Sequence, residues 1–76
     1  MKILGIDPGT ATTGYGVLSI EQNKLSLLDF GWIETSKKDS AEERLVTIYR
    51  KTVSIIKNHK PDILVLERLF FATNVK

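Results

Sequence analysis

Two acidic residues, Asp7 and Glu67, each stand at the end of a short apolar run, in KILGID and in ILVLE. Carboxylates that converge in a cleft repel each other, and a divalent cation relieves the repulsion. The chain has no cysteine and a single histidine, so it lacks the sulfur and nitrogen ligands that zinc prefers. Carboxylate oxygens favour Mg²⁺ or Mn²⁺ instead. Two such ions about 4 Å apart activate water and stabilise the leaving oxygen in phosphodiester hydrolysis. The two residues are therefore candidate metal ligands.

Each of these residues also has a simpler explanation. Asp7 precedes Pro8 and Gly9, and aspartate is a common turn residue in that position. Glu67 is equally explained as the first solvated residue after a buried strand. Neither residue decides between these explanations alone, so the elements that carry them have to be considered together.

Three strands are predicted in the first half of the chain. KILGID (2–7) is a compact apolar run, and its lack of polar alternation suggests burial on both faces. GYGVLSIE (14–21) and KLSLLDFGWIE (24–34) follow, joined by a hairpin turn at Gln22-Asn23. Gly31 is predicted to mark a bulge or a point of close packing. Trp32 is expected to pack.

A helix is predicted after the third strand, because apolar residues recur at spacings of three and four. Ser40 and Glu43 have the spacing of a capping box, His59 suits the negative end of the helix dipole, and Pro61 ends the helix. A fourth strand is predicted at 62–67, and a loop entering a second helix at 68–76. The apolar positions of the first helix are Leu45, Ile48, Tyr49, Thr52, Ile55 and Ile56, with Tyr49 expected to pack.

This order of elements predicts a mixed α/β sheet with strand order 3-2-1-4. Each hairpin reverses the chain, and the helix forms a crossover that returns it, so the first and fourth strands become parallel neighbours. Adjacent strands lie about 4.8 Å apart. Asp7 and Glu67 are therefore expected to converge at the carboxyl edge of the sheet, where open α/β folds bind ligands.

Composition limits the class of protein without naming it. The 76 residues allow at most one small domain, and the absence of cysteine excludes disulfides. No segment approaches the length of a membrane span, and the start is too short for a signal peptide, so a soluble cytoplasmic protein is expected. The net charge of +2 permits a nucleic acid partner but does not demand one.

The motifs resemble one family closely. GIDPGTATTGYGV (5–17) and PDILVLERLFFATN (61–74) are similar to the amino-terminal half of the RuvC family of Holliday-junction resolvases, which have the RNase H-like fold. The resemblance covers essentially the whole chain. It implies a Mg²⁺-dependent endonuclease, with Mn²⁺ as an alternative ion, that cleaves four-way junction DNA in recombination and repair.

The resemblance also implies roles for single residues. Asp7 and Glu67 match the family's first two catalytic, metal-binding carboxylates. Phe70 matches an aromatic thought to stack against bases near the exchange point, although either Phe70 or Phe71 is expected to be buried. Arg68 and Lys76 are candidates by position rather than by resemblance, because they follow the carboxylate edge, where positive charge suits a DNA backbone.

One departure qualifies these expectations. The family's metal site needs two further acidic positions from a later helix, and this chain ends before them. Residues 1–76 are therefore expected to be the amino-terminal part of a single RNase H-like nuclease domain, to hold half a metal site and to be inactive alone. The complete protein is expected to be a homodimer, with a branch-migration helicase as a further candidate partner.

Two other functions stay open at this point. Actin-like ATPases and sugar kinases have a phosphate loop that resembles GIDPGT, in which Asp7 would hold the Mg²⁺ of a nucleotide. Pro8 and the ERLFFATN segment fit the resolvase better. A non-catalytic DNA- or protein-binding relative is the other alternative, and the presence of both carboxylates argues against it.

Overall fold

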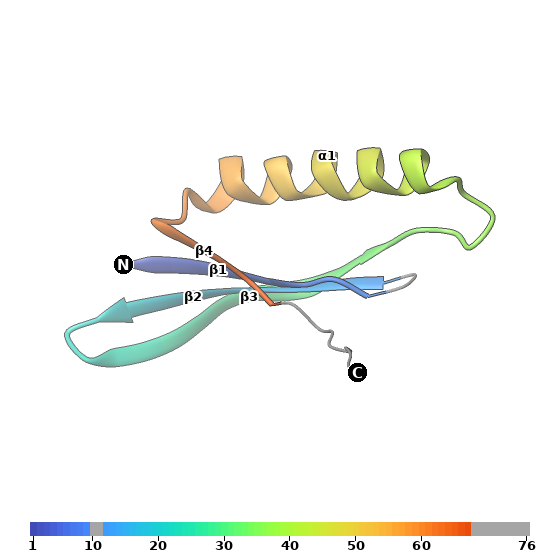
Figure 1. The fold of residues 1–76 in the computed structure, drawn as a ribbon. Helices are drawn as coiled ribbons and strands as arrows, with labels where there is room; N and C mark the ends of the chain where they lie inside the picture. The colour runs from blue at the N-terminus through green and yellow to red at the C-terminus, as the bar shows by residue number, and fades with distance from the viewer. Residues whose placement is uncertain (10–11, 68–76) are drawn as a thin grey trace, which may run out of the picture.

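The computed structural model describes residues 1–9 and 12–67, which form a four-stranded mixed sheet with a helix along one face (Figure 1). The sheet order is β3-β2-β1-β4, with β1 antiparallel to β2 and parallel to β4. The predicted strand order and crossover helix are therefore confirmed. The segment 68–76, predicted as a loop entering a helix, lies outside the described residues. The elements are β1 (Lys2–Asp7), β2 (Thr12–Glu21), β3 (Lys24–Glu34), α1 (Ala41–His59) and β4 (Ile63–Leu66).

The hairpin between β2 and β3 turns where the sequence predicts it. Gln22 and Asn23 both have positive φ, 52° and 66°, as a two-residue turn with the right-handed strand twist requires. The ladder shifts register once, because Val17 pairs with Asp29 while the next residue pairs with Leu27. Leu28 is the extra residue, so the β-bulge lies there.

Gly31 is a point of close packing rather than the bulge. It pairs with Tyr15, and a Cβ added at Gly31 would lie 2.9 Å from the Tyr15 hydroxyl oxygen and 3.1 Å from two ring carbons. Glycine is therefore required here by the Tyr15 ring, which crosses over the backbone of β3.

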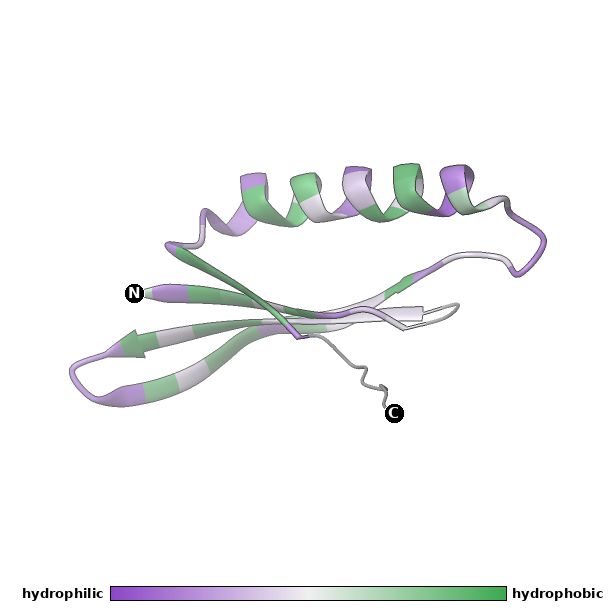
Figure 2. Ribbon diagram, in the orientation of Figure 1, coloured by the Kyte–Doolittle hydropathy of each residue, from purple (hydrophilic) through white to green (hydrophobic). Residues whose placement is uncertain are grey.

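The core lies between the sheet and α1. Leu4 and Ile6 of β1 and Val17 of β2 are buried, and Ile55 of α1 packs against them. Because side chains alternate along a strand, Leu4 and Ile6 share one face, while Ile3 lies on the other. Figures 1 and 2 show α1 over a single face of the sheet, and apolar residues along β1 and β4. The sequence predicts that both faces of β1 are buried. Within the described residues, α1 covers only one of them.

The apolar stripe of α1 is wider than its contact with the sheet. Ile48 and Ile55 are half-buried, whereas Leu45 and Tyr49 are 67% and 70% exposed. Trp32 of β3 is 63% exposed. The expectation that both aromatic residues pack is wrong within the described part of the chain, where both side chains are mostly exposed. Among residues 1–9 and 12–67, no helix has the length and apolar character to cross a membrane.

Both ends of α1 are fixed by side chains. The Ser40 hydroxyl accepts the Glu43 N–H at 3.0 Å and the Glu43 carboxylate accepts the Ser40 N–H at 2.8 Å, which confirms the capping box. At the other end, Lys60 is left-handed and its N–H bonds the Ile56 carbonyl. His59, predicted only as a dipole partner, also contacts the Asp29 carboxylate of β3, with Nε2 and Oδ2 2.9 Å apart.

Replacement of Ser40 by alanine should lower the stability of the native protein by about 1 kcal/mol, because the Glu43 N–H loses its acceptor at the start of the helix. Urea unfolding followed by circular dichroism measures this loss. Ser54→Ala is the matched control, since Ser54 is exposed in the middle of α1, where alanine is the better helix former. Equal losses from both variants would contradict the capping role.

Replacement of Gly31 by alanine should destabilise the native protein by about 1–3 kcal/mol, because the new methyl group overlaps the Tyr15 ring. Thermal unfolding measures the loss. Adding Tyr15→Phe to Gly31→Ala removes the nearest atom and should recover part of the stability. A stable Gly31→Ala protein would show that the two residues are not in contact.

Candidate metal centre

Asp7 is the last residue of β1 and lies on the face of the sheet that α1 does not cover. Alternation along β1 places Asp7 with Ile3 and Gly5, opposite the buried Leu4 and Ile6. Its partner across the ladder is Gly14 of β2, which has no side chain. The Asp7 side chain is therefore exposed, beside a strand that leaves it room.

The chain turns sharply after Asp7, and Gly9 permits the turn. A Cβ at Gly9 would collide with the carbonyl oxygen of Thr12. None of the described glycines has a positive φ, so close approach of the backbone, rather than a left-handed conformation, explains this glycine.

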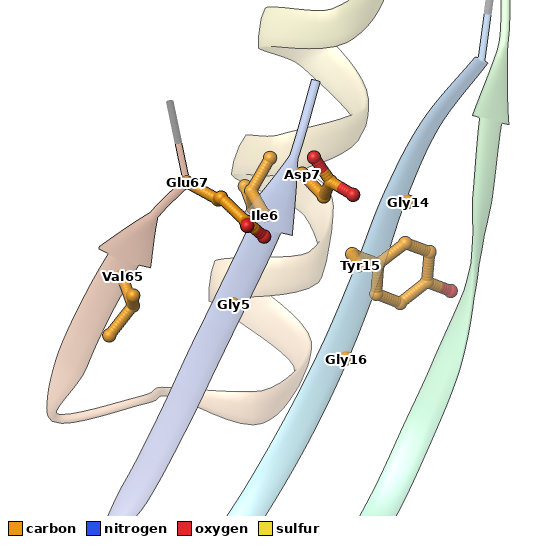
Figure 3. A pocket seen from close by; sticks show the side chains of 8 residues that line it. All are labelled: Gly5, Ile6, Asp7, Gly14, Tyr15, Gly16, Val65 and Glu67. Carbon is orange, nitrogen blue, oxygen red and sulfur yellow. The ribbon is translucent and has the colours of Figure 1, made fainter. Parts of the chain in front are cut away.

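Glu67 is placed beside Asp7 by the parallel pairing of β4 with β1. Ile6 pairs with Leu66, and the Glu67 N–H donates to the Ile6 carbonyl at 2.9 Å. Continuing this register sets Glu67 opposite Asp7, at the strand spacing of about 4.8 Å. Both residues fall on the face away from α1, and Figure 3 shows them at adjacent strand ends. The predicted convergence of the two carboxylate-bearing residues is thus present.

A shallow cavity of about 190 Å³ lies in front of the pair. Three glycines form its floor, and none of their Cβ positions meets another atom closer than 4.0 Å. The cavity is therefore bounded by backbone, which leaves space for a hydrated ion beside the two acids. It is lined by Gly5, Ile6, Asp7, Gly14, Tyr15, Gly16, Val65 and Glu67 (Figure 3).

These glycines are the part of the site that sequence reasoning missed. In the middle of a strand, glycine weakens pairing and marks a place where a ligand or another backbone approaches. The alternation of Gly14 and Gly16 in TGYGV was a usable signal, because glycines two residues apart in a strand share one face.

The donor set fits a hard divalent cation in part. Mg²⁺ keeps several waters and is commonly held by one or two carboxylates, which two exposed acids on one edge can supply. Within residues 1–9 and 12–67, neither Asp7 nor Glu67 has an ion-pair partner. The same residues contain no group of three or more side chains of the metal-ligating types.

Three predicted site residues are not placed. Arg68, Phe70 and Lys76, the expected DNA contacts, all lie outside the described residues.

Comparisons with known proteins agree with the geometry. A profile of the family described as "Crossover junction endodeoxyribonuclease RuvC" matches residues 3–76. A protein of that name from Alkaliphilus oremlandii is 50% identical over 76 residues, which cover all of this chain and 46% of that protein. The chain thus spans less than half the length of this curated relative.

Solved structures are similar as well. Thermus thermophilus RuvC in complex with a Holliday junction substrate superposes with a TM-score of 0.82 at 30% identity, over 97% of this chain and 48% of that one. The likeness confirms the RNase H-like fold predicted from the sequence. The Aquifex aeolicus PPX-GPPA enzyme reaches a TM-score of 0.70 at 18% identity, over 87% of this chain and 25% of that one, which shows a shared fold alone.

Proposed function

The chain belongs to the RuvC family of crossover junction endodeoxyribonucleases. We propose that it is part of a metal-dependent nuclease that cuts phosphodiesters at four-way DNA junctions. The observation that carries the proposal is the register of β4 on β1, which sets Glu67 beside Asp7 on an open face. The Thermus relative, whose structure is described as a complex with a Holliday junction substrate, supports the choice of DNA.

In this proposal Asp7 and Glu67 hold Mg²⁺, or Mn²⁺ in its place, through their carboxylate oxygens. The bound ion supplies activation of water and stabilisation of the leaving oxygen. The residues of this chain orient the ion: the ladder fixes both strand ends, and the glycine floor leaves the approach to them open.

We propose further that residues 1–76 form the amino-terminal part of a single RNase H-like nuclease domain. The remaining acidic ligands and the contacts of a homodimer would come from other parts of the native protein, so the 76 residues alone should not cleave. Two copies facing one junction would give paired symmetric nicks. A cytoplasmic location and a helicase partner for branch migration belong to the same proposal.

Three residues that follow β4 in the sequence are proposed to bind the DNA. Phe70 would stack on an unpaired base, where base–aromatic stacking is worth about 1–3 kcal/mol. Arg68 and Lys76 would contact phosphates, which position a duplex without reading its sequence.

Replacement of Asp7 by asparagine, or of Glu67 by glutamine, should slow junction cleavage by at least about a hundredfold, the equivalent of roughly 2.7 kcal/mol of transition-state stabilisation. Junction binding should largely persist, because it rests on phosphate contacts. Cleavage of a synthetic four-way junction and gel-shift titration of the native protein measure the two effects.

Asp39→Asn is the matched control for these variants, because it removes the same charge from the loop before α1. It should cleave normally. Retained cleavage by Asp7→Asn would refute the assignment of this residue. Junction binding without cleavage by the wild-type protein would instead identify a non-catalytic relative.

Cleavage should require Mg²⁺ and stop in EDTA, whereas Ca²⁺ should support junction binding without cleavage. The reason is that Mg²⁺ demands near-ideal octahedral geometry, while Ca²⁺ binds more oxygen ligands at longer distances. The same junction, incubated with the native protein in each ion, tests this. Cleavage in EDTA at the rate measured in Mg²⁺ would contradict metal dependence.

A further inference from the structure

The strand that carries Glu67 to the site has little burial among the described residues. β4 is four residues long, and its side chains from Ile63 to Leu66 are 42–62% exposed. Among the described residues it pairs on one side only, with β1. Its register within the described residues is therefore fixed by hydrogen bonds, those of the ladder with β1 and those at its two ends.

At the start of β4, a single residue of β1 makes three hydrogen bonds to the chain that enters the strand. The Asp62 N–H donates to the Lys2 carbonyl at 2.8 Å, and the Lys2 N–H donates to the Asp62 carboxylate at 2.9 Å. The Lys2 ammonium also donates to the His59 carbonyl, at the end of α1, at 3.0 Å. These contacts among Lys2, His59 and Asp62 are named here the Lys2 clamp.

The Asp62 carboxylate takes the place of a missing backbone acceptor. In the register that β4 keeps on β1, the N–H of Lys2 would donate to the carbonyl of Pro61, and its carbonyl would accept the N–H of Ile63. Lys60, however, is in the left-handed conformation that ends α1, and Pro61 follows it. The side chain of Asp62 accepts the N–H of Lys2 instead, and so closes the ladder directly after the helix.

The clamp therefore determines where the other end of β4 lies. β4 is extended from Ile63 to Leu66, and each strand residue advances about 3.3 Å. A slip of one residue would turn Glu67 to the face that α1 covers, and a slip of two would move it by about 6.6 Å along β1. Either shift would separate Glu67 from Asp7.

We propose that Asp62 is a positioning residue for the metal centre: by closing the ladder on Lys2, it sets the register that brings Glu67 beside Asp7. This inference rests on the proposed function, since it concerns the same two carboxylates. Asp62 lies at the opposite end of β4 from the site and touches neither metal nor substrate in this proposal.

The test compares Asp62→Ala with Asp39→Ala in the native protein. The two aspartates are matched in their hydrogen bonding, because each carboxylate accepts one backbone N–H, that of Ser36 in the case of Asp39, at 3.1 Å; Asp62 is exposed and Asp39 is half-buried. Asp62→Ala should raise the Mg²⁺ concentration for half-maximal junction cleavage about tenfold, as loss of an outer support of a metal site does. Asp39→Ala should leave it unchanged.

Two further variants separate positioning from folding. Asp62→Asn keeps an oxygen acceptor and should restore the Mg²⁺ requirement to within about threefold of wild type. Lys2→Met removes only the bond to the His59 carbonyl and should shift the requirement in the same direction by a smaller factor, about threefold. Junction affinity in Ca²⁺ should change less than twofold in every variant.

Binding of Mn²⁺ to the DNA-free protein, followed by electron paramagnetic resonance, gives a readout independent of cleavage and should weaken about tenfold in Asp62→Ala. Equal shifts in Asp62→Ala and Asp39→Ala, or lost cleavage with unchanged Mn²⁺ affinity, would overturn the proposal. A wild-type protein that binds Mn²⁺ but does not cut junctions would overturn the proposed function. The Mn²⁺ affinities of the variants would still test the positioning role of Asp62. If the wild-type protein binds no Mn²⁺, amide hydrogen exchange tests the Lys2 clamp instead. Residues 63–67 should then exchange faster in Asp62→Ala than in Asp39→Ala, and equal rates would overturn the proposal.

Discussion

The parallel pairing of β4 with β1 is the contact on which the rest of the structure depends. Antiparallel neighbours are joined by short turns, but two parallel strands need a crossover, and α1 provides it. The pairing therefore requires the helix, its cap at Ser40 and its stop before Pro61. It also makes two carboxylates that are sixty residues apart in the sequence lie at one edge of the sheet.

Much of this arrangement could be predicted from the sequence because it follows from local rules. Hairpin turns, strand runs and a capped helix are each encoded within a few residues, and their order leaves few ways to pair the strands. The bounds of β1 and β3 agree with the prediction, whereas β2 begins two residues earlier than predicted, at Thr12. The adjacency of Asp7 and Glu67 then follows from strand order alone.

The features that could not be predicted depend on which side chains meet across elements. Nothing local to His59 indicates that its ring reaches Asp29, thirty residues earlier in a strand. The bulge falls at Leu28, which no glycine marks. Likewise, the periodicity of α1 defines an apolar face, but the width of the sheet beneath decides that Ile48 is half-buried and Tyr49 exposed. Contacts of this kind depend on how the elements pack in three dimensions, and the spacing of residues along the sequence does not contain that information.

The open position of the metal centre also has an energetic reason. Two carboxylates about 5 Å apart repel by roughly 1 kcal/mol in water, but by several times more where water is excluded. Asp7 and Glu67 are both exposed, so the sheet tolerates the pair without a neutralising lysine or arginine among the described residues. A cation at this edge then meets uncompensated charge. The cost to folding stays small, and the attraction for a divalent ion is retained, because the acids lie at strand ends on an uncovered face.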